Sequence, residues 1–279
     1  MKADRNMSLA SGRSAGNRAF PDRRDALKFV LLTPLAGLLA DSGLSARAAS
    51  TVENVSLDLP SGKTVRAALA RPASEPAPAI VLFHEWWGLN DQIKTVAADL
   101  AAKQGYVALA VDLFDGSVTD QPDVARKQTG SVDPEVASQT SMSWIKWLRQ
   151  QDFVKGGVGT IGWCFGGAWS LRASTATPVD ATVVYYGNVE MAADELAGLK
   201  GPVLGHFATK DQWINADMVA RFSKAMQDAN KDLTVHWYDA DHAFANPTGG
   251  RYDAEDAAAA WQRTIAFFGK TLGQGKMGG

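Results

Sequence analysis

The hydrophobic positions along the chain fall into two patterns, one typical of buried strands and one typical of helices. Short apolar runs without alternation, rich in β-branched residues, suit strands of a parallel sheet covered on both faces. Residues 79–83 form the clearest run, Ala-Ile-Val-Leu-Phe. Pro60-Ser61-Gly62 predicts a turn between two earlier strands. The full set of expected strands is 51–59, 63–71, 79–83, 106–111, 158–163, 181–186, 203–207 and 233–238.

Between these runs, apolar residues recur every three or four positions, as on one face of a helix. Residues 91–104 have this spacing, and Gly105 follows as a helix-ending residue. Asp133 and Pro134 predict the start of another helix that reaches about residue 151. Residues 114–131 show little periodicity and are expected to be a loop. The remaining expected helices are 165–173, 218–229 and 254–272. Strands that alternate with helices predict an α/β fold with a doubly wound, mostly parallel sheet flanked by helices.

The first 48 residues differ from the rest in composition. They hold eight Lys or Arg residues and four acidic residues, and the pair Arg23-Arg24 precedes an apolar stretch at residues 29–40. Ala46-Arg47-Ala48 has the small-x-small pattern of a signal peptidase site. These features predict a twin-arginine-type signal peptide and export to the periplasm. The stretch is shorter than the about 20 residues that span a bilayer, so no stable membrane anchor is expected after cleavage. An uncleaved anchor and a disordered basic arm are the alternatives.

Residues 49–272 are expected to form one domain, and the Gly-rich residues 273–279 a disordered tail. Of the chain's 28 basic and 30 acidic residues, 20 and 26 lie beyond residue 48, without a basic block. Nucleic acid is therefore not an expected partner. The chain has a single cysteine, which excludes an intramolecular disulfide. A monomer or weak homo-oligomer is expected.

That cysteine lies in the most informative segment, Gly162-Trp163-Cys164-Phe165-Gly166-Gly167. The segment matches the nucleophile-elbow pattern G-x-S-x-G of α/β-hydrolases, with Cys in place of Ser. It follows a predicted strand and precedes a predicted helix, and the helix N-terminus favours negative charge at the sulfur. The sequence therefore predicts that Cys164 is a nucleophile. The alternative is a buried, inert cysteine beside a tight turn.

A histidine base must follow the nucleophile along the chain, with an acid between them. His84 precedes Cys164, while His206 and His236 fall within predicted strands. His242 lies in the loop after the last strand and before the closing helix, where the base belongs. His242 is therefore the predicted general base.

The acid should follow the strand at residues 203–207, and Asp211 lies in that loop. Asp239 and Asp241 are rivals because they are close to the histidine in sequence, but near neighbours rarely orient each other's side chains. Asp211 is therefore expected to orient His242. For the oxyanion hole, the pattern predicts the backbone N–H of Phe165 and one N–H from residues 84–88.

At these residues the chain resembles the dienelactone hydrolase family, from about residue 51 to residue 272. The matching elements are His84-Glu85-Trp86-Trp87-Gly88-Leu89-Asn90, Ala110-Val111-Asp112-Leu113-Phe114, the cysteine segment, Asp211 and Asp241-His242-Ala243-Phe244. The resemblance implies a Cys164–Asp211–His242 triad, the N–H of Trp86 as second oxyanion donor, and no cofactor. It also implies that Glu85 contacts the resting Cys164 and takes part in its activation. The alternatives for Glu85 are a solvated loop acid or part of a metal motif; Gly88 stands where H-E-x-x-H requires a histidine, so no metal site is predicted.

The chain departs from the family pattern at two positions where arginines help bind an anionic lactone. Gly116 and Asn246 stand there instead. Neither can replace a bidentate Arg–carboxylate pair, so the anionic dienelactone is not the expected preferred substrate. Arg126, Arg172 or Arg251 are candidates to substitute, and a solvated surface position is the alternative for each.

Aromatic residues near the expected site suggest an apolar or aromatic acyl group in the substrate. The predicted pocket residues are Trp87, Trp163, Trp213 and Phe244, whereas Trp144, Trp147, Trp169 and Trp261 are expected in the core. Together the sequence predicts a cofactor-free hydrolase of a small-molecule ester or lactone. A thioesterase or acyl transferase on the same residues, and a non-catalytic thiol sensor or binding protein, are the alternatives.

Overall fold

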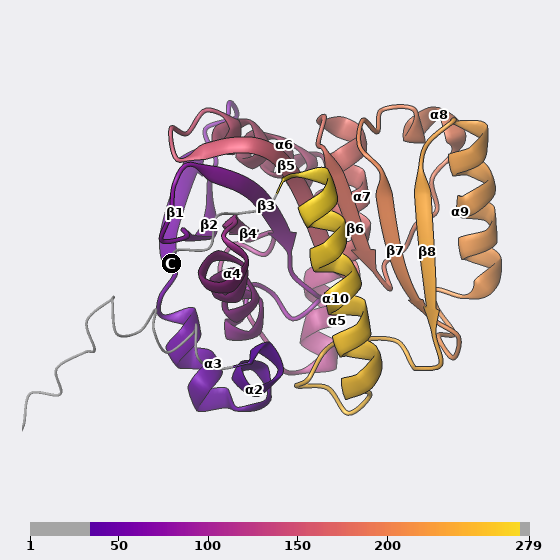
Figure 1. Cartoon of the computed structure of the whole chain (residues 1–279), viewed down its shortest axis with the longest axis horizontal. Coiled ribbons are helices and arrows are strands. Elements are labelled where there is room, and N and C mark those ends of the chain that lie inside the picture. The colour runs from indigo at the N-terminus through magenta and orange to yellow at the C-terminus, as the bar shows by residue number, and fades with distance from the viewer. Residues whose placement is uncertain (1–33, 274–279) are drawn as a thin grey trace, which may run out of the picture.

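The computed structural model describes residues 34–273, which contain an eight-stranded sheet in the order β1-β2-β4-β3-β5-β6-β7-β8. The first two strands run antiparallel to their neighbours, and all strands from β4 to β8 are parallel. Figure 1 shows the sheet crossing the molecule. The strands are β1 Glu53–Asp58, β2 Thr64–Ala70, β3 Ala77–Phe83, β4 Val107–Val111, β5 Val154–Trp163, β6 Ala181–Tyr185, β7 Val203–Ala208 and β8 Leu233–Tyr238.

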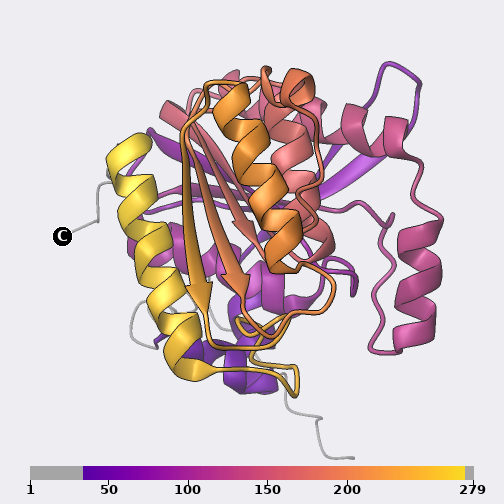
Figure 2. The ribbon, with the colours of Figure 1, turned by 90° about the vertical axis from the view of Figure 1, so that its right-hand side faces the viewer.

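Helices cover both faces of the sheet. α4 and α10 pack on one face, whereas α6, α7 and α9 pack on the other. Figure 2 shows the second half of the sheet between α10 and α9. The helices are α2 Leu35–Ala40, α3 Ser42–Ala49, α4 Asp91–Gln104, α5 Pro122–Gly130, α6 Pro134–Arg149, α7 Phe165–Ala176, α8 Ala193–Leu196, α9 Ala216–Asp228 and α10 Ala254–Thr271.

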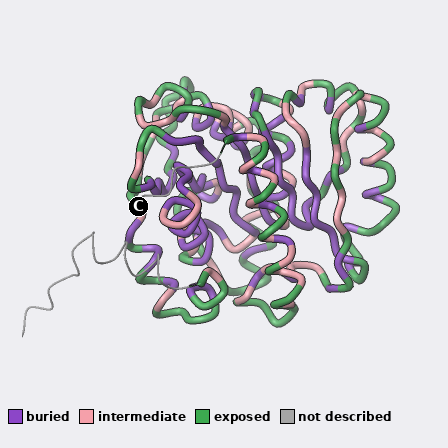
Figure 3. Tube along the Cα trace, viewed as in Figure 1, coloured by how far each residue is buried: buried purple, intermediate pink, exposed green. Residues whose placement is uncertain are grey.

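The central strands are buried along their length because helices cover them on both sides. Every residue of β3, β4, β6 and β7 is buried, which explains the apolar runs without alternation. Figure 3 shows this buried centre inside an exposed rim of helices and loops. The outer strand β1 is largely exposed. The expected α/β-hydrolase architecture is confirmed.

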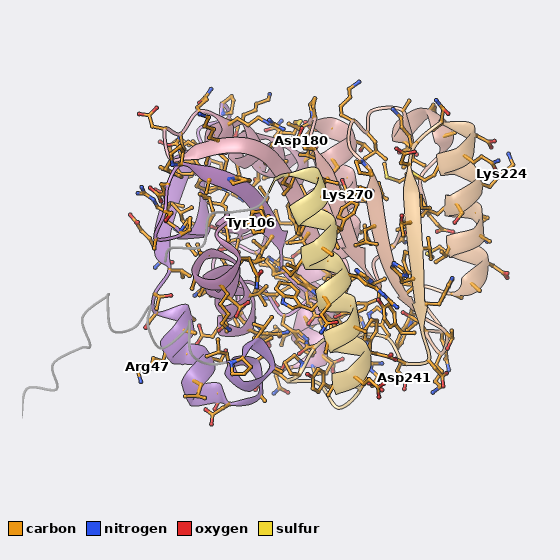
Figure 4. All side chains as sticks on the ribbon, viewed as in Figure 1. Arg47, Tyr106, Asp180, Lys224, Asp241 and Lys270 are labelled. Carbon is orange, nitrogen blue, oxygen red and sulfur yellow. The ribbon has the colours of Figure 1, made fainter. Side chains whose placement is uncertain are left out.

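Because β3 to β8 are parallel, the loops that follow them lie at one edge of the sheet. In Figure 4 Asp241, in the loop after β8, marks this edge, and Asp180, just before β6, lies at the opposite edge. The chemistry-bearing segments after β3, β5, β7 and β8 therefore meet, as expected for open α/β sheets.

The sequence missed two helices within the domain. α5 (Pro122–Gly130) lies in the segment expected to be a loop, and α8 (Ala193–Leu196) spans only one turn. Only Ala125 of α5 is buried, so the helix has no apolar stripe to reveal it. Its usable signals were at its start, Pro122 at the first turn followed by Asp123.

Helices α2 and α3 lie within the segment expected to be a signal peptide, and they pack against α4. Leu38 and Ala48 are fully buried, and the hydroxyl groups of Ser45 and Thr95 are 2.9 Å apart. Cleavage after Ala48 stays a prediction, whereas Arg23-Arg24 and most of the tail lie outside the described residues. Among residues 34–273, no helix combines the length and the apolar character needed to cross a bilayer.

Candidate active site

The turn between β5 and α7 holds Cys164 in a strained conformation, with φ 54° and ψ −116°. The flanking glycines are required because the chain crosses itself here. A Cβ at Gly162 would lie 1.9 Å from the carbonyl oxygen of Gly166, and one at Gly166 would lie 2.1 Å from that of Phe83. The local sequence therefore folds into a nucleophile elbow, with Cys164 at the N-cap of α7.

His242 lies between Cys164 and Asp211. Its Nδ1 is 2.6 Å from Oδ2 of Asp211, and its Nε2 is 3.2 Å from Sγ of Cys164. Since an ionised carboxylate only accepts hydrogen bonds, we assign the hydrogen to Nδ1. Nε2 then presents its lone pair to the thiol and is placed to take its proton.

Asp211 is 5 % exposed and follows β7 in a tight turn. Burial opposes its ionisation. Hydrogen bonds from His242 and from the backbone N–H groups of Ile214 and Trp213 outweigh burial and lower the pKa of Asp211. The carboxylate therefore stays ionised and oriented. Its rival Asp239 instead pairs with Lys210 at the surface.

The Cys164 sulfur is a protonated thiol in the resting site. Burial, followed by the negative charge of Glu85, raises the pKa of Cys164 to about 12, although the backbone N–H of Phe165 lowers it. This N–H of Phe165 is also the group that the sequence predicts as the first oxyanion donor. Trp86, the other expected donor, lies in the loop after β3 and lines the cavity that Cys164 also lines.

His84 fixes the backbone of that loop. Its Nε2 accepts a hydrogen bond from the N–H of Leu113 at 3.1 Å, so its Nδ1 carries the hydrogen and donates to the carbonyl of Glu85 at 2.6 Å. Burial lowers the pKa of His84. The imidazole is therefore neutral and structural, consistent with its exclusion as the base.

Glu85 is 3 % exposed, lines the same cavity as Cys164, and its negative charge acts on the thiol. Oε2 accepts a hydrogen bond from Nδ2 of Asn246. The Glu85 carboxyl group interacts with the Tyr186 hydroxyl, but neither Oε1 nor that hydroxyl makes a well-formed hydrogen bond within the described part of the chain. Burial raises the pKa of Glu85 to about 7, against the opposing effects of Asn246, Tyr186 and Arg251. Glu85 therefore changes charge near neutral pH.

A cavity of about 660 Å³ opens onto Cys164. Trp86, Trp87 and Trp213 line it, and the Trp213 ring lies 5.3 Å from the His242 ring. Two of the expected pocket residues, Trp87 and Trp213, are therefore at the cavity.

The other two expected pocket residues, Trp163 and Phe244, do not line this cavity. Trp163 belongs to β5, where successive side chains point to opposite faces, so it packs on Tyr185 and lines a separate cavity of about 210 Å³ with α4 and α10. Phe244 is fully buried against Tyr186 and Tyr238. Trp169, expected in the core, is 5 % exposed but also lines the cavity at Cys164.

Sequence reasoning also underrated three arginines. Arg126, Arg172 and Arg251 all line the cavity with Cys164. Arg251 lies over the Trp213 ring at 5.4 Å and its charge lowers the pKa of Cys164 and of Glu85. Their positions depend on α5, α7 and the loop before α10, so no local pattern could have placed them together. The sequence could therefore name them only as candidates for binding an anion.

Across residues 34–273, no three His, Cys, Asp or Glu side chains converge to hold a metal ion. The cavity presents a thiol, an imidazole, the carboxyl group of Glu85 and aromatic walls, and Asp211 contacts the imidazole from behind. These groups are suited to attack on an acyl carbonyl.

Residues 65–272 match the model of the dienelactone hydrolase family. The carboxymethylenebutenolidase of Pseudomonas putida is 30% identical over 226 residues, 77% of this chain and 95% of that protein. The protein Usf of Aquifex pyrophilus is 30% identical over 223 residues, 76% of this chain and 95% of that protein. A solved dienelactone hydrolase-like promiscuous phosphotriesterase from metagenomic libraries has the same fold, with a TM-score of 0.69, 24% identity and coverage of 80% of this chain and 99% of that one. The chain belongs to the dienelactone hydrolase family and is a carboxylic ester hydrolase.

Proposed function

We propose that the protein hydrolyses ester or lactone bonds through a Cys164–His242–Asp211 triad and an acyl-enzyme. The observation that carries the proposal is the linear arrangement of the three side chains, with contacts of 2.6 Å and 3.2 Å on the two sides of one imidazole. An orienting acid is needed for turnover and not for a passive thiol.

In the first half-reaction, His242 takes the Cys164 proton as the sulfur attacks the carbonyl carbon. The resulting oxyanion is stabilised by the N–H groups of Phe165 and Trp86. When the tetrahedral intermediate collapses, the carbon–oxygen bond breaks and the leaving alkoxide receives the proton from His242. In the second half-reaction, His242 deprotonates water, which attacks the thioester and releases the acid and the Cys164 thiol.

The cavity indicates which acyl groups fit. Its indole walls favour an apolar or aromatic part, and its arginines favour a negatively charged group near that part. We therefore propose that an anionic ester or lactone is accepted even though Gly116 and Asn246 replace the expected arginines. Carboxymethylenebutenolidase, the name of the Pseudomonas putida relative, is consistent with this substrate class.

A panel of p-nitrophenyl esters and lactones, followed by intact-mass measurement after quenching, tests the proposal. We expect turnover and an acyl adduct that maps to Cys164. A panel without turnover and without any adduct on Cys164 would instead favour a thiol sensor or binding protein on the same fold.

We further propose that the enzyme is exported and is cleaved near Ala48. The basic segment with Arg23-Arg24 and the Ala46-Arg47-Ala48 pattern support this proposal. N-terminal sequencing of periplasmic material should give a terminus close to residue 49. An intact Met1 terminus in that fraction would contradict it.

A further inference from the structure

Asn246 lines the same cavity as Cys164, and contacts within its own loop hold its side chain in place. It is 3 % exposed and lies four residues after His242. Its Oδ1 accepts two hydrogen bonds from Thr248, from the backbone N–H at 2.9 Å and from the hydroxyl at 2.7 Å. Its own backbone N–H donates to the carbonyl of Ala243 at 3.0 Å.

These contacts fix the orientation of the amide. Oδ1 cannot turn toward Glu85 without losing both bonds from Thr248. The donor group Nδ2 therefore faces Glu85, where it contacts Oε2. An oxygen that accepts from an N–H donor at this geometry is a poor place for a proton.

We propose that Asn246 is a positioning residue that confines the titratable proton of Glu85 to Oε1, the carboxyl oxygen that Asn246 does not contact. Because Asn246 is a neutral donor, Glu85 can gain or lose this proton without breaking an ion pair. The reactivity of Cys164 then follows the protonation state of Glu85. The inference rests on the proposed role of Cys164 as the reactive thiol.

The groups around Glu85 determine the sign of the effect. Cys164, Tyr186 and Arg251 interact with its charge directly, and His242 lies on the other side of the sulfur. An ionised Glu85 repels a thiolate, whereas a protonated Glu85 does not. The pKa of Glu85, about 7, places this change close to neutral pH.

The alkylation rate of Cys164 by iodoacetamide, measured from pH 5 to pH 9, reports the coupling. The logarithm of the rate should rise with pH, flatten as Glu85 loses its proton, and then rise again. Glu85→Gln removes the inflection assigned to Glu85 and leaves the contributions of the other groups. The difference between the two profiles gives the midpoint for Glu85.

Asn246→Asp keeps the shape of the side chain but replaces the donor by an acceptor. Two carboxyl groups then share one site, so we expect the midpoint to rise by about one pH unit or more. Thr248→Val removes the hydroxyl that anchors Oδ1 and should move the midpoint in the same direction by less. Thr248→Ser keeps the hydroxyl and should leave it unchanged.

Circular dichroism and thermal unfolding establish that each variant is folded; should Asn246→Asp not fold, Thr248→Val carries the test. Unmoved midpoints in the folded variants would overturn the inference. Ester turnover is measured separately. Alkylation profiles that shift as expected without any turnover would refute the proposed function and leave the role of Asn246 intact.

Discussion

At the scale of single residues, the chemistry of Cys164 depends on how its neighbours are held. The thiol is protonated at rest because burial and Glu85 raise its pKa to about 12, so the proposed attack needs a base to remove the proton. In the proposed mechanism His242 is that base, and its contact with Asp211 favours the tautomer that this role requires. The elbow and the order of these residues were readable from the sequence because both follow from chain geometry.

Replacing Asp211 by Asn should therefore impair turnover through the wrong tautomer of His242. We expect kcat for p-nitrophenyl esters to fall by about 10³–10⁴ with little change in KM. Asp239→Asn is the matched control, because Asp239 pairs with Lys210 at the surface and should keep full activity. A larger loss from Asp239→Asn than from Asp211→Asn would reverse the assignment.

The arginines of the cavity show that sequence spacing does not reveal tertiary contacts. Arg251 comes to the cavity because its loop folds back over Trp213, a tertiary contact that spacing does not encode. For the same reason Trp163 and Phe244 were wrongly expected in the pocket. Proximity in sequence to Cys164 or His242 says nothing about which side of the strand or loop a side chain occupies.

Arg251→Ala should separate substrates by charge. An arginine that bonds a carboxylate contributes about 1.5–3 kcal/mol, so kcat/KM for an anionic ester should fall about 10- to 100-fold. A neutral ester of the same shape should lose less, because only the effect of the Arg251 charge on the pKa of Cys164 and Glu85 applies to it. Arg221→Ala is the control, since Arg221 pairs with Glu190 at the surface. Equal losses for both esters would exclude anion recognition by Arg251.

At the scale of elements, the elbow depends on the close packing of β5 against the start of α7. Gly162→Ala places a methyl group 1.9 Å from the carbonyl of Gly166, so the two segments must separate. We expect a loss of about 3 kcal/mol or more in the free energy of unfolding, together with loss of activity. Gly130→Ala has open space and should be neutral in thermal unfolding. A stable, active Gly162→Ala protein would contradict the proposed role of this contact.

The elements that sequence analysis missed are those with little core of their own. α5 buries one residue, so its apolar periodicity is absent, whereas α4, with a buried face, was predicted with its observed bounds. α2 and α3 were assigned to a signal peptide on composition, which says nothing about docking. In the structure they pack against α4, where Leu38 and Ala48 are buried with Ala98.

The docked helices α2 and α3 should limit access to the predicted cleavage site. Ala48 is fully buried against α4, and a signal peptidase needs extended chain. Leu38→Asp introduces a charge into this contact and should speed limited proteolysis near residue 48 of the full chain, with ester turnover unchanged. Ala40→Asp alters an exposed position of the same helix and should have no effect. Equal cleavage rates for the two variants would mean that docking does not protect the site.

At the scale of the whole molecule, the buried Glu85 makes the free energy of unfolding depend on pH. Because folding raises its pKa from 4.5 to about 7, the folded state binds this proton more tightly than the unfolded chain does. The contribution of Glu85 to the stability of the folded state is therefore fully present below pH 4.5 and is lost as the pH rises through about 7. A pKa shift of this size lowers the free energy of unfolding above pH 7 by about 3 kcal/mol relative to low pH.

The buried histidines act in the opposite sense. Burial lowers the pKa of His84 and His206, so their contribution to stability is lost as the pH falls below the ordinary histidine range. The pH dependence of the wild-type protein therefore combines two opposing trends. A comparison with Glu85→Gln isolates the carboxylate because both proteins contain the same histidines.

We expect the Tm of Glu85→Gln to exceed that of the wild type at pH 8 by several degrees, since each kcal/mol corresponds to about 2–4 °C in a domain of this size. At pH 5, where Glu85 is protonated in the folded state, the two Tm values should converge. A difference that is equal at both pH values would show that Gln merely packs better. A difference that grows with pH would show that the ionised Glu85 side chain destabilises the folded protein.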